Sequence, residues 1–147
     1  MATTPPESAE PIAELRTQYA SDRDAVPNAV TDVETFAEQH ALPASVLDAL
    51  MLAVAEAVAN GVEHGNSEAS ARQVFLRLTA TPAHWTLRVT DEGAGLPPDA
   101  LDDVSLPDDL LDTGGRGLFI IQQIADAVWL EEDGRCVCLR FDVPAEP

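Results

Sequence analysis

The stretch that decides the fold is ASVLDALMLAVAEAVANGVEHGN, residues 44–66. Its large apolar side chains recur at helical spacing and form one stripe. This pattern predicts a helix from residue 44 or 45 to about His64, packed on a sheet. The stripe consists of Leu47, Leu50, Met51, Val54, Val58 and Val62. Gly65 and Asn66 are suited to end the helix.

Two polar side chains interrupt this apolar helix. Between residues 49 and 62, Glu56 is the one ionisable group and Asn60 the one other polar side chain. They are four residues apart and therefore share a helical face, which His64 continues. A carboxylate in apolar surroundings suits a general base, and an amide oxygen can bind a hard cation such as Mg²⁺. The plainer alternative is a solvated helix edge.

Periodicity predicts the elements around this helix. We expect an edge strand at 12–20, helices at 22–40 and 115–126, and strands at 74–81, 85–89, 128–131 and 136–143. Strand runs with helices to one side give two packed layers. The sequence therefore predicts an α+β fold, a two-layer α/β sandwich whose mixed, mostly antiparallel sheet is covered on one face by three helices.

Two glycine-rich segments follow predicted strands or open a predicted helix. Asp91-Glu92-Gly93-Ala94-Gly95 comes directly after a strand. Its aspartate can accept a hydrogen bond from a ligand amine, and its glycines permit positive φ and close backbone approach. By itself this pattern also fits many ordinary loops.

The second segment is Gly114-Gly115-Arg116-Gly117-Leu118, at the start of the helix predicted over 115–126. Glycines before a helix N-terminus leave backbone N–H groups free, and the helix dipole adds positive charge, so an anion can bind without lysine. Simple helix capping is the equally plain alternative.

The charge balance limits the partners. The chain has 26 acidic and 8 basic residues, for a formal net charge of −18, and every basic residue is arginine. Without lysine there is no Walker-type P-loop and no eukaryotic-type protein kinase site. Direct binding to nucleic acid or to an anionic membrane is not expected. The acidity serves either solubility or attraction to a basic partner.

We expect a cytoplasmic protein, because no segment resembles a signal peptide and the uncharged stretch Ala49–Ala55 is too short to span a bilayer. Cys136 and Cys138 alternate on a predicted strand and should point to one face. Two cysteines without a nearby histidine are too few for a structural zinc site, so we expect reduced thiols that pack as small core residues.

The order and spacing of these motifs resemble those of the GHKL ATPase superfamily, which includes gyrase B and histidine kinases. The form EAVANGVEHGN, DEGAGLP and GGRGLFIIQQIAD is similar to that of the bacterial anti-sigma-factor serine/threonine kinases. The resemblance covers about residues 22–143 and implies a Bergerat ATP-binding fold. We therefore expect a disordered tail at 1–11, a GHKL domain at 12–147 and an ATP lid at about 96–114.

The resemblance also implies roles for individual residues. Glu56 would be the catalytic base, and Asn60 would hold Mg²⁺ at the ATP phosphates. Asp91 would bind the adenine amino group. The remaining nucleotide contacts would come from His64, Gly93, Gly95, Gly115, Arg116, Gly117 and Leu118. These assignments agree with the chemistry argued above and identify the ligands as ATP and Mg²⁺.

The sequence departs from the family pattern at two places. Many members carry a threonine on the last or penultimate strand as a further adenine contact, whereas Arg135, Cys136 and Val137 follow Gly134 here. The expected lid contains six aspartates between Asp99 and Asp112, which oppose a nearby triphosphate. We therefore expect modest nucleotide affinity.

The resemblance implies an anti-sigma factor in a partner-switching pathway. Such a protein sequesters a sigma factor and phosphorylates a serine or threonine of a STAS-domain antagonist. Related domains often dimerise, so a homodimer is a further partner to test. The alternative is a non-catalytic module that binds nucleotide or sequesters a partner. A histidine kinase piece is less favoured, because none of His40, His64 and His84 fits a phospho-acceptor on a dimerising helix pair.

Overall fold

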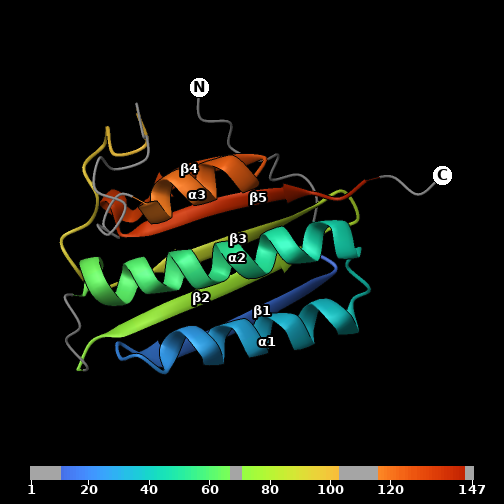
Figure 1. The fold of residues 1–147 in the computed structure, drawn as a ribbon, viewed down its shortest axis with the longest axis horizontal. Coiled ribbons are helices and arrows are strands. Elements are labelled where there is room, and N and C mark those ends of the chain that lie inside the picture. The colour runs from blue at the N-terminus through green and yellow to red at the C-terminus, as the bar shows by residue number, and fades with distance from the viewer. Residues whose placement is uncertain (1–10, 67–70, 103–115, 145–147) are drawn as a thin grey trace.

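The computed structural model of the protein describes residues 11–66, 71–102 and 116–144. In this part of the chain, three helices lie on one face of a five-stranded sheet (Figure 1). The two-layer α+β sandwich predicted from the sequence is thus confirmed. The four strand pairings described are all antiparallel, so the parallel pairing that a mixed sheet requires is not formed among them. Residues 1–10 of the tail expected at 1–11, and residues 103–114 of the lid expected at about 96–114, lie outside the described residues.

The strands run in the order β1-β2-β3-β5-β4. Their bounds are β1 Ala13–Ala20, β2 Gln73–Ala80, β3 His84–Thr90, β4 Ala127–Glu131 and β5 Cys136–Asp142. The strands expected at 74–81 and 85–89 are confirmed as β2 and β3, which form an antiparallel hairpin and pair from Phe75↔Thr90 to Ala80↔Trp85. The weakly signalled edge strand is confirmed as β1. Burial alternates along β2: Val74, Leu76, Leu78 and Ala80 are buried under the helices, whereas Phe75 and Arg77 are exposed on the opposite face.

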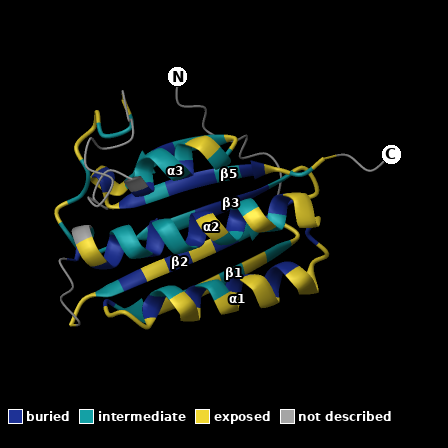
Figure 2. Ribbon diagram, in the orientation of Figure 1, coloured by how far each residue is buried: buried dark blue, intermediate teal, exposed yellow. Residues whose placement is uncertain are grey.

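The helices are α1 Ala25–Gln39, α2 Ala44–Asn60 and α3 Arg116–Ile124. Helix α2 lies between the other two and contacts both (Figure 1). Its predicted stripe faces the core: Leu50, Val54, Val58 and Val62 are buried, and Leu47 and Met51 pack partly buried against them. Figure 2 shows the same division, with buried residues toward the sheet and exposed ones on the outer surface of the helices.

Helix α2 does not end as a plain α-helix. Gly61–Gly65 forms a π-helical turn, in which the Asn66 N–H donates to the Gly61 carbonyl at 2.8 Å. Such turns are rare and are often found at functional sites. The predicted end of the helix at Gly65 and Asn66 is correct, but its last turn is wider than predicted.

By length and composition, Ala44–Glu63 is also the one helix among the described residues that could cross a membrane. A helix buried in a protein core passes the same test, and the apolar stripe of α2 is packed in this core.

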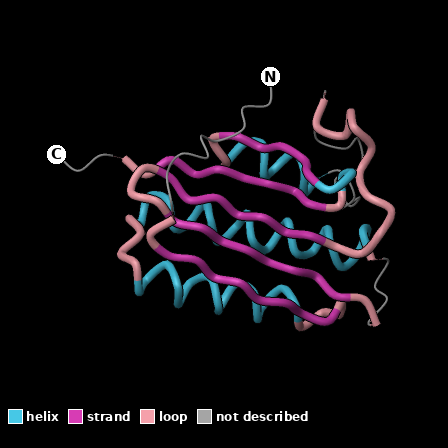
Figure 3. The backbone as a smooth tube through the Cα atoms, turned by 180° about the vertical axis from the view of Figure 1, so that it is seen from behind, coloured by secondary structure: helices cyan, strands magenta, loops and turns pink. Residues whose placement is uncertain are grey.

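The opposite face of the sheet carries no helix among the described elements. Viewed from behind, the strands lie in front of the helices (Figure 3). On this face β2 and β3 present polar and charged side chains, including Arg77 and Arg88, while β4 and β5 bury Trp129, Cys136 and Cys138 as a small separate cluster.

Candidate functional site

A cleft of about 340 Å³ opens where α2 and α3 meet the end of the sheet. It is lined by Ala57, Asn60, Gly61, Gly65, Arg72, Val89, Asp91, Ala94, Gly95, Leu96, Leu118, Gly134 and Val137. The structure thus brings four of the predicted site residues to one cleft: Asn60, Asp91, Gly95 and Leu118. This volume is within the range of small-molecule sites.

Asn60 is the last residue of α2 and points its amide toward the start of α3. Gly117, in the first turn of α3, lies directly against it, since a Cβ placed on Gly117 would be 2.7 Å from Asn60 Nδ2. A side chain at position 117 would therefore displace either the Asn60 amide or the start of α3. Glu56 lies one turn earlier on α2, half-buried and outside the cleft lining. The predicted pair shares a helix face, with the amide in the cleft and the carboxylate beside it.

Asp91 directly follows β3 and is half-buried in the cleft. Its Oδ1 accepts a hydrogen bond from the Gly93 N–H at 2.8 Å, and its own N–H donates to the Arg135 carbonyl at 3.0 Å. Burial raises the pKa of this carboxyl above its usual value, although the Gly93 hydrogen bond and the charges of Arg135 and Arg72 offset part of the effect. The Asp91 carboxylate is thus held in place and partly removed from water. A ligand amine would therefore replace a hydrogen bond that water no longer donates to it.

The π-helical turn is packed tightly on Asp91. A Cβ placed on Gly65 would be 2.1 Å from Asp91 Oδ2, so no side chain fits at position 65. Gly93 is close to the same turn, where a Cβ would meet the Gly65 carbonyl oxygen at 1.8 Å. The end of α2 and the loop after β3 therefore form one wall of the cleft.

Gly95 has φ +88°, so the expectation of a positive φ in this loop holds at Gly95. Gly93 is required for close approach instead. The neighbouring Leu96 N–H donates to the Gly134 carbonyl at 2.9 Å, which joins the loop to the turn between β4 and β5.

Asn66 holds three segments of the site together, whereas the sequence pattern predicted only that this residue ends a helix. The side chain is fully buried. Its Nδ2 donates to Ser21 Oγ at 2.5 Å and to the Gln73 carbonyl at 2.9 Å, and its Oδ1 accepts from the Glu92 N–H at 2.7 Å. The amide thus links the ends of β1 and α2 to the start of β2 and to the loop that carries Asp91.

Part of the predicted site lies outside the described residues. Gly115 is one such position, and the side chains of His64 and Arg116 are also outside them, although the backbone of both belongs to described helical turns. The phosphate-binding role of Gly115, Arg116 and Gly117 therefore stays a prediction. Two lining residues that sequence reasoning missed are Arg72 and Val137. Alternation along β5 places Val137 on the helix side, so it could have been found from its neighbours.

Comparison with protein families gives the family of this chain. The model of the histidine kinase-like ATPase domain matches residues 19–141, a range that includes all three helices and β2 to β5 except Asp142, but only the last two residues of β1. This chain belongs to the histidine kinase-like ATPase family. A search of curated proteins found no match.

Membership in the histidine kinase-like ATPase family makes this an ATP-binding module of the GHKL type. A larger hollow of about 990 Å³ lies over the helix-free face of the sheet, but it is lined by none of the predicted nucleotide-site residues. The smaller cleft is therefore the candidate nucleotide site.

Proposed function

We propose that this protein is an ATP-dependent serine/threonine protein kinase that acts as an anti-sigma factor. The observation that carries the proposal is the arrangement of Glu56, Asn60 and Asp91. The Asn60 amide at the end of α2 and the Asp91 carboxylate after β3 line one cleft. The Glu56 carboxylate lies one turn before Asn60 on α2. The similarity of EAVANGVEHGN to the anti-sigma-factor kinases supports the narrower assignment.

Each of these residues has a task in phosphoryl transfer. Asp91 accepts a hydrogen bond from the adenine amino group, and Asn60 supplies an amide oxygen for Mg²⁺, which neutralises charge on the phosphates when bound. Glu56 accepts the proton of the substrate hydroxyl as that oxygen bonds to the γ-phosphorus. The bond from the γ-phosphorus to the β–γ bridging oxygen breaks, and ADP leaves.

We further propose that the substrate is a STAS-domain antagonist and that the protein sequesters a sigma factor until the two partners exchange. This step rests on the resemblance. The net charge of −18 is compatible with a basic partner surface, because charge complementarity steers association and disfavours wrong partners.

The positions of His40 and His84 favour a serine or threonine of another protein as the phosphate acceptor, rather than either of these histidines. His40 follows the end of α1 and its ring contacts Phe36, with ring centroids 4.5 Å apart. His84 begins β3 at the hairpin turn. Neither lies on a helix that could pair with a second copy as a phospho-acceptor helix.

A non-catalytic nucleotide-binding module is the second candidate, and Val137 favours it. This apolar side chain lines the cleft on the last strand, on which many relatives place an adenine-binding threonine. Under this alternative, the chain binds ATP and holds its partner without transfer.

A transfer assay separates the two candidates. The wild-type protein, γ-labelled ATP, Mg²⁺ and the STAS-domain protein of the native host should give a labelled antagonist. Glu56→Gln should lower the transfer rate at least about 100-fold, the contribution of a general base, and still bind ATP. Asp48→Asn, an exposed position two turns earlier on α2, is the matched control and should label normally. Binding of ATP without transfer by the wild type would leave the non-catalytic module.

A further inference from the structure

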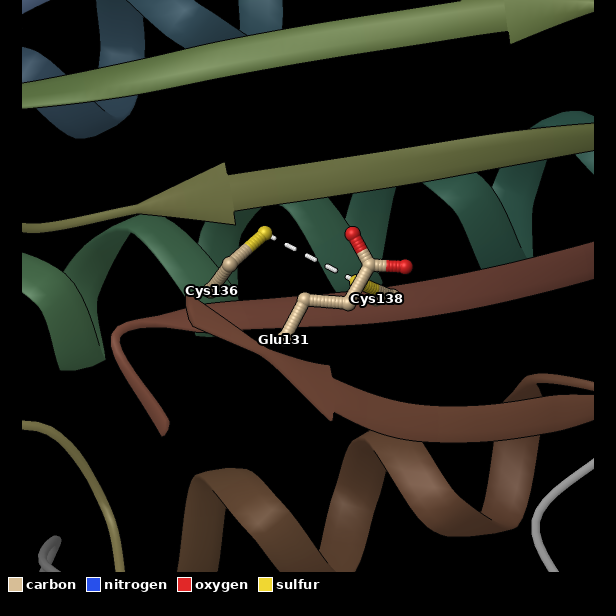
Figure 4. Close-up of side chains that lie close together, drawn as sticks. All are labelled: Glu131, Cys136 and Cys138. Carbon is tan, nitrogen blue, oxygen red and sulfur yellow. Dashed lines mark hydrogen bonds between the residues drawn. The ribbon is translucent and has the colours of Figure 1, made fainter. Parts of the chain in front are cut away.

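Three side chains with metal-binding atoms meet on the helix-free face of the sheet, opposite the face that the helices cover. They are Cys136 and Cys138 on β5 and Glu131 on β4 (Figure 4). The two sulfurs and the carboxylate oxygen lie within 4.8 Å of one another. The expectation that both cysteines share one face is confirmed, and the third group comes from the neighbouring strand.

The sheet fixes this arrangement. Alternation along β5 puts both cysteines on the same side, and the antiparallel register pairs Glu131 with Cys136 and Trp129 with Cys138. The backbone of the three groups is therefore held by the strand ladder. The spacing along the sequence does not indicate that Glu131 lies beside the cysteines, because the register between β4 and β5 determines this contact.

The distance between the sulfurs suits a tetrahedral ion. The two Sγ atoms are 3.6 Å apart. Two thiolates bound to one tetrahedral Zn²⁺ at about 2.3 Å would be about 3.8 Å apart, whereas opposite positions on an ion at that bond length would need about 4.6 Å. Small side-chain rotations would bring the cysteines to the tetrahedral distance.

The surroundings of Glu131 orient its carboxylate and balance the charge. Arg88 Nε donates to Oε1 at 3.2 Å, and the Trp129 indole N–H donates to Oε2 at 2.9 Å. Outer groups of this kind orient metal ligands in known sites. Two thiolates, one carboxylate, a divalent ion and the Arg88 guanidinium sum to zero charge.

An ion can approach these buried sulfurs from the solvent. The hollow of about 990 Å³ over this face is lined by Arg88, Thr90, Glu131 and Cys136, among others. Cys136 is about 1% exposed and lines this hollow beside the carboxylate. Cys138 is fully buried, and its sulfur lies 3.6 Å from that of Cys136.

We propose that Glu131, Cys136 and Cys138 bind a thiophilic divalent cation of the Zn²⁺ type, with water in the fourth position. Three protein ligands are fewer than the four of a closed structural site, so the ion exchanges with solution. The site adjoins the nucleotide cleft through the backbone: Val137, between the two cysteines, lines that cleft, and the Arg135 carbonyl accepts from the Asp91 N–H. A bound ion would therefore stiffen the strand that supports Asp91.

The test is a titration of the reduced, metal-free full-length protein with Co²⁺, which takes the place of Zn²⁺ and is visible by absorbance. We expect a thiolate-to-cobalt charge-transfer band that saturates at one equivalent and is abolished by Zn²⁺. Glu131→Gln removes a proposed ligand and should weaken Co²⁺ binding by at least about 10- to 100-fold, the effect of losing only an outer hydrogen-bonding partner. Glu132→Gln, the exposed neighbour, should not change it.

Two results would overturn the proposal. One is the absence of a charge-transfer band in the wild-type protein at stoichiometric Co²⁺. The other is an unchanged band in Cys136→Ser, whose folding is checked by circular dichroism. If Cys136→Ser does not fold, the titration of the wild-type protein still tests the proposal by itself.

Discussion

Asp91 is the residue at which stability and nucleotide binding conflict. Its pKa is raised by burial, so the folded state holds the proton more tightly than the unfolded state. Ionisation of Asp91 therefore costs stability, and the cost develops as the pH rises above the ordinary value of 3.8. The same charged, partly desolvated carboxylate is suited to an adenine amine.

Asp91→Asn should accordingly raise the melting temperature at neutral pH, because asparagine does not ionise and the variant avoids the stability cost of a charged Asp91. It should lower the affinity for Mg·ATP about 10- to 100-fold, because a hydrogen bond to a charged group contributes roughly 1.5–3 kcal/mol. Calorimetry with ATP and with inosine triphosphate, which lacks the amino group, checks this. The variant should lose the preference for ATP; an unchanged preference would remove Asp91 from the base-binding role.

Asn66 is the other residue whose substitution is informative, since one buried amide satisfies groups in three segments. Asn66→Ala leaves the Glu92 N–H and the Gln73 carbonyl without this partner. We expect a loss of about 2–4 kcal/mol in the free energy of unfolding, measured by urea denaturation. Ser21→Ala removes one of the three bonds and should cost about 1 kcal/mol. Equal losses for the two variants would show that Asn66 does not link the segments.

At the scale of elements, a side-chain hydrogen bond links the edge strand β1 to α1. The Tyr19 hydroxyl donates to Asp32 Oδ2 at 2.7 Å. Burial, together with the negative charge of Asp32, raises the pKa of Tyr19 to about 12. Because the folded value lies above the ordinary 10.0, stability should fall as the pH rises from 10 toward 12.

Tyr19 is the single tyrosine, so tyrosinate absorbance reports this contact alone. We predict a titration midpoint near 12 while circular dichroism still shows the folded protein. Asp32→Asn should shift the midpoint downward. A wild-type midpoint near 10 in the folded state would mean that β1 and α1 are not joined as described.

The elements that the sequence predicted best are those with strong local periodicity. The apolar stripe of α2 and the periodicity of β2 and β3 both specify their structure within a few residues. The π-helical turn at Gly61–Gly65 could not be predicted, because its side-chain pattern is the same as that of an α-helical turn.

Contacts between distant segments were also beyond sequence reasoning. Asn66 meets Ser21 across 45 positions, and Glu131 reaches the cysteines through strand register. Both depend on how elements pack. The motif residues Asn60 and Asp91 were found because a ligand-binding group in an apolar helix, or directly after a strand, stands out locally. The catalytic role of Glu56 and the phosphate-binding roles of His64, Gly115 and Arg116 stay predictions.

At the scale of the whole molecule, the net charge of −18 opposes folding through repulsion among like charges. Raising the sodium chloride concentration from about 10 mM to about 150 mM shortens the screening length from about 30 Å to about 8 Å. We expect the melting temperature to rise by about 2–4 °C, the shift that roughly 1 kcal/mol produces in a chain of this size. Potassium chloride should act equally. A lower melting temperature at higher salt would show that attractive ion pairs dominate instead.

The central claim is that the cleft between α2, α3 and the end of the sheet binds Mg·ATP through Asn60 and Asp91. Isothermal calorimetry of the full chain with ATP and Mg²⁺ tests it most directly, with Asn60→Ala compared against the Asp48→Asn control. The account predicts saturable binding at one nucleotide per chain for the wild type and the control, and its loss in folded Asn60→Ala. Absence of binding to the wild type, or undiminished binding to Asn60→Ala, would contradict it.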